Sequence, residues 1–249
     1  MKLGPNTTAF VEGTLDAAVP LISTVKPTDQ INDSIWKKLV GEPSEYPKPK
    51  AISPEEQHVM KLFWVFTEIH SCIERLKDCE TYVNRFPFGR TRVSRASYLQ
   101  FVVEGHLHEI YVLRERLEKL AKVVARSFKR DRNAKRIARA ADVLVEFVTQ
   151  ALSGFTNVRG VHVHQWRYTH QDIERLQLIA TLRTPKRSPF ARSLLRLEGV
   201  ATAETHSRLR KQSRIWNRMV SEIVEEFFKH LNPMVLREDG KTFILPKKR

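Results

Sequence analysis

The chain has 249 residues, of which 41% are hydrophobic and 29% charged, a balance that allows a buried core and argues against disorder throughout. Its 9 Gly residues favour helices over a turn-rich β architecture. A formal net charge of +15 predicts an affinity for polyanions, chiefly nucleic acid, with a highly charged solvated surface as the alternative.

Residues 1–52 differ in composition from the rest of the chain. They carry six Lys and six Asp or Glu, and they contain Pro5, Pro20, Pro27, Pro43, Pro47 and Pro49. Because proline interrupts helices, this spacing predicts an irregular N-terminal arm. Glu12 and Asp16 break the apolar stretch at the start of the arm, so we expect no signal peptide.

Three helices are predicted from apolar residues at alternating steps of three and four. The first begins at Ser53, an N-cap followed by Pro54 and acidic residues, and its stripe is Val59, Leu62, Phe66, Ile69, Ile73 and Leu76. The second, of about 30 residues, has the stripe Leu99, Val103, His106, Ile110, Leu113, Leu117, Leu120 and Val124. The third spans 133–152, with the stripe Ile137, Ala141, Leu144, Val148 and Leu152.

The helical period stops between Gly154 and Tyr168. Residues 169–172 then resemble a capping box with Thr169 as the N-cap, and a short helix follows with Ile173, Leu176 and Ala180 as its apolar residues; Pro185 and Pro189 end it. Residues 190–231 predict one or two further helices, stopped by Pro233, whose inward residues are Leu209, Trp216, Met219, Ile223 and Phe227. For residues 236–249 we expect a short hairpin or a tail.

These elements predict an all-α fold. We expect an antiparallel helical bundle of about four core helices over 53–185, preceded by the arm over 1–52 and followed by a basic helical extension and tail over 186–249. No apolar run approaches the roughly 18 residues of a spanning helix, so we expect no membrane contact. Cys72 and Cys79 lie on one helix about 10 Å apart in rise and cannot pair, which suits a reducing compartment and a cytoplasmic protein.

Positive charge is concentrated in two stretches. Residues 83–129 hold ten basic against four acidic residues, and residues 183–218 hold ten against two. The third helix also begins with basic residues. The expected contacts with nucleic-acid phosphates are Arg130, Arg132, Lys135, Arg136, Arg208, Arg210, Lys211, Arg214 and Arg218. Trp216 lies on an inward stripe, so we interpret it as a core residue rather than a base-stacking platform.

The stretch from Asn157 to His170 contains three His and two Arg where a loop meets a helix. Imidazole exchanges protons near neutral pH, and a guanidinium holds a phosphate through two parallel hydrogen bonds. These residue types therefore suit phosphodiester chemistry or phosphate binding, and neither needs a metal or another cofactor.

Arg159 and His164, separated by four residues and placed after the third helix, resemble the motif of HEPN domains. The helix containing SYLQFVVEGHLHEIYVLRERLEKL is similar to an early bundle helix of that family, and the resemblance covers roughly residues 55–185. Many HEPN proteins are metal-independent ribonucleases that act as dimers. The resemblance thus implies a homodimer that binds RNA, in which Arg159 stabilises charge on the phosphorane and His164 moves a proton.

Further residues of the stretch would support this pair: Asn157, His162, Tyr168 and His170. The family usually has a polar residue, often Asn, directly after the Arg, where this chain has Gly160. Either Asn157 takes that role or the active site is degenerate.

Other interpretations of the same residues stay open. Arg159, His164 and Trp166 are also suited to capping helix ends and bonding across the bundle. Alternatively, a metal ion is bound by His162, His164 and His170, with Asp172 as the nearest acidic ligand. A non-catalytic basic module that binds nucleic acid or a protein partner is the alternative function. His106 is interpreted as a core histidine, and Cys72 as a buried small hydrophobic residue.

Overall fold

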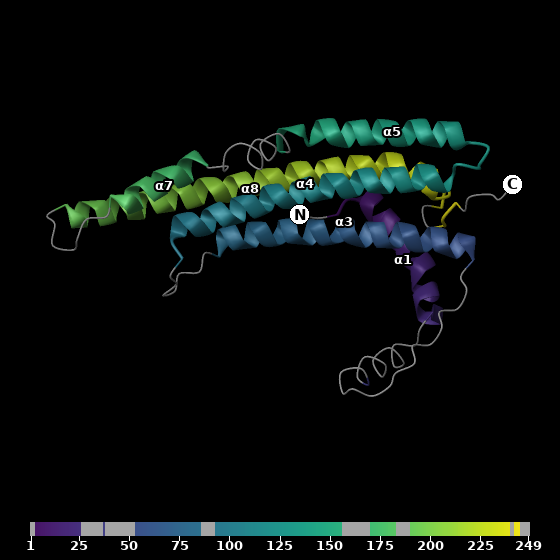
Figure 1. The fold of residues 1–249 in the computed structure, drawn as a ribbon, viewed down its shortest axis with the longest axis horizontal. Coiled ribbons are helices and arrows are strands. Elements are labelled where there is room, and N and C mark those ends of the chain that lie inside the picture. Colours follow the sequence, from purple (N-terminus) through teal and green to yellow (C-terminus); the bar gives the residue numbers. More distant parts are fainter. Residues whose placement is uncertain are drawn as a thin grey trace. The chain divides into compact units, whose positions relative to one another are not determined.

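The computed structural model describes residues 3–25, 37, 53–85, 93–155, 170–182, 190–239 and 242–244. Every regular element in these ranges is an α-helix, as Figure 1 shows. The helices are α1 (Pro5–Val25), α3 (Pro54–Asn84), α4 (Arg95–Ser127), α5 (Ala134–Ala151), α7 (Gln171–Thr181) and α8 (Ala191–Val235). The predicted all-α helical bundle is confirmed.

Helices α3, α4 and α5 follow their predicted bounds and faces. The Ser53 hydroxyl accepts a hydrogen bond from the Glu56 backbone N–H at 3.1 Å, and the Glu56 carboxylate accepts one from the Ser53 N–H, which makes a reciprocal cap at the start of α3. All residues of the three predicted stripes are buried. The stripes were predictable because side chains three and four positions apart share one face of a helix.

The expectation of an irregular N-terminal arm is wrong for Pro5–Val25, which forms helix α1 of 21 residues. Pro5 occupies the first helical position, where the missing N–H costs nothing. Pro20 lies inside the helix, and its lost hydrogen bond is outweighed by burial of residues such as Phe10, Thr14 and Ala18. Residues 26–36 and 38–52 of the predicted arm lie outside the described residues.

Helix α8 is one continuous helix of 45 residues and corrects two predictions. Pro233 does not stop it, since it lies in the last turn, where one missing backbone bond matters little beside the complete burial of Leu231 and Val235. Met219 is not inward but 42% exposed. The inward face instead includes Ser213 and Asn217, and polar residues on a buried stripe escape a search for apolar ones.

After α8, the chain makes an isolated antiparallel bridge between Leu236 and Phe243. The Arg237 N–H donates to the Thr242 carbonyl at 2.8 Å, and the Ile244 N–H donates to the Val235 carbonyl at 2.8 Å. Among the described residues of 236–249, this pairing favours the predicted hairpin over a tail.

The chain divides into two compact units. Unit 1 takes residues 69–115 and 147–223, and its core brings residues of α3, α4, α7 and α8 together: Val83, Ala96, Leu99, Val102, Val103, Leu107, Ile173, Leu176, Ile179, Ala201 and Leu209. Unit 2 takes residues 3–68, 116–146 and 224–249. An aromatic cluster joins its segments, with Phe10 packed 5.5 Å from Phe66, 4.8 Å from Phe228 and 5.9 Å from Phe243 between ring centroids.

A helix that spans a lipid bilayer must be both long and apolar. Within the described ranges, none combines the length and the apolar character needed to span a membrane.

Candidate nucleic-acid interface

The predicted catalytic pair falls in a part of the chain that the structure does not describe. Arg159 and His164 lie outside the described residues, as do Asn157, His162 and Tyr168. His170, at the end of the same stretch, is described, and so is Phe155 on its other side. These two residues show where the stretch meets the helices of unit 1.

Both flanking residues contact the same turn of α8. The ring of Phe155 meets the ring of Trp216 at 5.7 Å and 90°, and the His170 imidazole Nε2 lies 3.0 Å from Oε1 of Gln212. Gln212 and Trp216 are four residues apart and therefore one helical turn apart. The described residues on either side of 156–169 thus contact one short section of α8.

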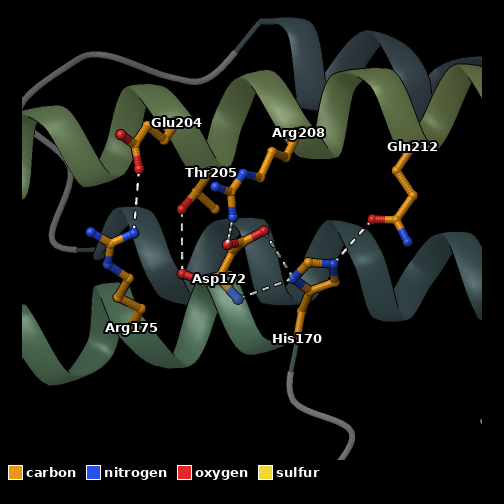
Figure 2. A network of polar contacts seen from close by, with 7 residues as sticks. All are labelled: His170, Asp172, Arg175, Glu204, Thr205, Arg208 and Gln212. Atoms are coloured by element: carbon orange, nitrogen blue, oxygen red, sulfur yellow. Dashed lines mark hydrogen bonds and ion pairs between the residues drawn. The ribbon is translucent and has the colours of Figure 1, made fainter.

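His170 is the N-cap of α7, and its ring bonds to residues on both sides. Its backbone is extended, with φ −84° and ψ 127°, and its Nδ1 accepts a hydrogen bond from the Asp172 N–H at 3.3 Å. On its other side the ring reaches the Gln212 side chain through Nε2 (Figure 2). The prediction of Thr169 as the N-cap is wrong by one residue, because a histidine ring nitrogen takes the place of the usual hydroxyl.

Two ion pairs and a hydrogen bond join α7 to α8. Figure 2 shows Asp172 facing Arg208, whose guanidinium lies 2.7 Å from the carboxylate. The Thr205 hydroxyl donates to the Asp172 carbonyl at 3.3 Å, and Arg175 lies 3.3 Å from Glu204. Since α7 follows directly after the Arg/His-rich stretch, these contacts hold the end of the stretch on unit 1.

The five predicted phosphate-binding residues of α8 are all exposed, but they are not equivalent. Arg208 is engaged by Asp172, and Arg214 lies 3.4 Å from the Glu80 carboxylate. Arg210, Lys211 and Arg218 form no ion pair with any described residue. Of the five predicted residues, these three therefore keep a charge that no described side chain pairs.

A buried polar network lies beneath this part of α8. The His106 ring contacts Asn217 Oδ1 through Nε2 at 3.0 Å and the Ser213 hydroxyl through Nδ1 at 3.4 Å, and it meets the edge of Trp216 at 5.2 Å. Burial lowers the pKa of His106 to about 4, although the Asn217 hydrogen bond and the nearby Glu80 act in the opposite direction. His106 is therefore a neutral core histidine, as predicted, rather than an acid–base group.

Asn217 completes this network. Its Nδ2 donates to the Leu76 carbonyl and to the Glu80 carboxylate, each at 3.1 Å. Trp216 lies partly buried between the His106 and Phe155 rings, which supports its interpretation as a core residue.

The predicted basic residues near the start of α5 lie in unit 2. Arg130, Arg132, Lys135 and Arg136 are all exposed. They are separate from the α8 cations in the sequence and belong to a different compact unit.

No metal site is evident in the described ranges, where no group of three or more His, Cys, Asp or Glu side chains is placed to hold an ion. Of the residues in the metal interpretation, His170 and Asp172 are engaged by capping and by Arg208, and His162 and His164 lie outside the described residues. Cys72 and Cys79 are both buried on α3, and neither forms a disulfide within the described residues. Burial and nearby acidic groups raise the pKa of Cys79 to about 11, so its thiol is unreactive.

Sequence reasoning missed residues whose partners are distant in the chain. Gln212 and Glu80 gave no signal, because a polar residue on a charged helix does not reveal its partner. His58 was detectable, since it lies four residues before Leu62 on the apolar stripe of α3. It is 5% exposed, and neither ring nitrogen has a hydrogen-bond partner among the residues that the structure describes.

Comparison with known proteins found no family model, no curated protein and no solved structure that matches this chain.

Proposed function

We propose that the protein binds RNA at the basic face of α8 and cleaves it without a metal ion through Arg159 and His164. The observation that supports this most is the anchoring of Phe155 and His170 on one turn of α8. These residues flank the segment that contains the proposed pair. The unpaired cations Arg210, Lys211 and Arg218 belong to the same helix.

The chemistry follows from the residue types. The ribose 2′-hydroxyl attacks phosphorus while the bond to the 5′-oxygen breaks, leaving a 2′,3′-cyclic phosphate and a 5′-hydroxyl. Arg159 stabilises the charge of the phosphorane, and His164 moves a proton at the attacking or the leaving oxygen. Asn157, His162 and Tyr168 support this pair, and a homodimer assembles the site as the HEPN resemblance implies.

The test is cleavage of end-labelled RNA by the full-length protein in EDTA. We expect cleavage by the wild type, none of DNA of the same sequence, and loss of activity in Arg159→Ala and in His164→Ala. Substituting an exposed histidine on α4, His108→Ala, is the matched control and should leave the rate unchanged. Circular dichroism confirms that each variant is folded, and sedimentation gives the oligomeric state.

Each other outcome identifies a different function. Activity abolished by EDTA would favour a metal site that uses His162, His164 and His170. RNA binding without cleavage in the wild type would reject the enzyme and support a non-catalytic module. The observation in favour of this second candidate is that Arg210, Lys211 and Arg218 are exposed and unpaired among the described residues. Binding through these cations does not require Arg159.

A further inference from the structure

The turn between α4 and α5 carries a dense group of positive charges. We call residues 126–139 the α4–α5 corner. It belongs to unit 2, and its cations are Arg126, Lys129, Arg130, Arg132, Lys135, Arg136 and Arg139. All seven are exposed, and Asp131 is the one acidic residue among them.

None of these seven cations is engaged in an ion pair within the described part of the chain. Elsewhere in unit 2 the exposed cations are often paired, as Arg116 and Lys119 are with Glu68, each at 3.1 Å. Asp131 offsets only one of the seven positive charges, and its half-buried carboxylate accepts the Asn133 N–H at 2.8 Å. The corner therefore presents its charge to solvent.

The backbone of the corner is fixed by its own hydrogen bonds. The Asp131 N–H donates to the Phe128 carbonyl at 2.9 Å, the Ala134 N–H donates to the Asp131 carbonyl at 3.1 Å, and α5 starts immediately. On α5, Lys135, Arg136 and Arg139 are spaced so that their side chains share one side of the helix. The charges are thus arrayed on a rigid support.

The corner offers phosphate contacts but no exposed aromatic side chain on which a base could stack. Its one aromatic residue, Phe128, is 1% exposed and meets the buried His58 ring at 5.6 Å, and Ile137 is 6% exposed. Single strands gain much of their affinity from stacking on exposed aromatic side chains. A duplex hides its bases, presents phosphates at higher density and releases more counterions per contact.

We propose that the α4–α5 corner binds the phosphate backbone of duplex RNA, without regard to sequence. The inference rests on the proposed function in that RNA is the ligand, and it adds the structural class of that RNA and a binding surface separate from Arg159 and His164. Because the corner contacts phosphates only, duplex DNA binds it too, while cleavage remains confined to RNA, which has the 2′-hydroxyl.

The test compares the wild type with a full-length double variant that carries both Arg132→Ala and Arg136→Ala. Fluorescence anisotropy measures binding to a short duplex RNA, to its separated strand and to duplex DNA of the same sequence across a salt titration. Each phosphate contact contributes about 0.9 to the magnitude of the slope of log affinity against log salt concentration. At ~0.1 M salt, one contact therefore changes the affinity about eightfold. We expect the double variant to lose this eightfold factor once for each substituted arginine, for duplex RNA and for duplex DNA. Its affinity for the single strand should fall less.

Two controls separate charge from geometry and from position. The double variant that carries both Arg132→Lys and Arg136→Lys keeps the charge and should keep most of the duplex affinity. Lys61→Ala with Arg85→Ala removes the same charge from exposed positions elsewhere and should leave the affinity nearly unchanged.

Equal losses in the double variant and the Lys61/Arg85 control would overturn the assignment, and so would a greater loss for the single strand than for the duplex. Binding to anionic lipid vesicles in place of either duplex would assign the corner to a membrane surface. Loss of cleavage in Arg159→Ala with unchanged duplex binding leaves this inference intact, so its failure and that of the proposed function are distinguishable.

Discussion

The carboxylate of Glu225 on α8 caps the start of α1, and removing its charge should weaken unit 2. Oε1 accepts hydrogen bonds from the backbone N–H and the side-chain amide of Asn6, both at 2.7 Å. Oε2 accepts them from the Thr7 N–H at 3.1 Å and from the Thr7 hydroxyl at 2.9 Å. The perturbation is Glu225→Gln, which keeps the shape and one acceptor oxygen.

The magnitude follows from these contacts. A hydrogen bond to a charged group contributes about 1.5–3 kcal/mol, and a negative charge at a helix N-terminus adds about 0.3–1 kcal/mol. Since glutamine retains part of the hydrogen bonding and the donors regain some water, we expect a loss of roughly 2–4 kcal/mol in the free energy of unfolding.

The loss should depend on pH. Burial raises the pKa of Glu225, but the hydrogen bonds from Asn6 and Thr7 outweigh it and lower the pKa below its ordinary value. Such a carboxylate stabilises the fold above its unfolded pKa of about 4.3, and this contribution is lost as the pH falls through the lower folded pKa. The stabilities of wild type and Glu225→Gln should therefore converge in acid.

Urea unfolding, followed by far-UV circular dichroism at neutral and acid pH, measures both effects. Glu222→Gln, an exposed residue on the same helix, is the matched control. If Glu225→Gln costs no more than this control, or if its deficit persists unchanged in acid, the capping argument is refuted.

Two further predictions concern unit 2. In Gly4→Ala the new Cβ would lie 2.3 Å from Cδ and Oε2 of Glu225, so displacing the carboxylate should cost about 1–2 kcal/mol. The same substitution in Glu225→Ala, where no carboxylate is left to displace, should cost much less in a double-mutant cycle. His58→Phe should raise the free energy of unfolding by about 1 kcal/mol at neutral pH, because it removes two buried ring nitrogens without partners. Burial and the nearby Lys61 lower the pKa of His58 to about 4, so the wild type should lose stability as the pH falls from about 6.5 towards 4. The pKa of His106 is lowered in the same way, so His58→Phe should lose roughly half as much stability over this range. An unchanged pH profile in the variant would contradict this account.

Much of the fold was predictable because it depends on interactions between near neighbours in the chain. The stripes of α3, α4 and α5 and the Ser53 cap join residues three or four positions apart, and this spacing can be read directly from the sequence. The same local reasoning misjudged Pro5–Val25, where proline spacing argued against a helix. Contacts with distant residues, above all Glu225, stabilise it nevertheless.

The chemistry of the candidate site was predictable only as composition. The Arg/His-rich stretch and the basic residues of α5 and α8 are plain in the sequence, and so is the net charge that favours a polyanion. The sequence could not show which cations stay unpaired. Arg208 is engaged by Asp172, 36 residues away, while Arg210 is not paired among the described residues.

By itself, the sequence determined the all-α class, the bounds and faces of the central helices, and the positive charge. The tertiary structure decided that α1 is a helix capped by a residue 219 positions away, that His106 bonds to Asn217 across 111 positions, and that His170 caps α7. The physical reason is that helix periodicity is a local property, whereas the partner of a buried or charged group is chosen by packing between helices far apart in the chain.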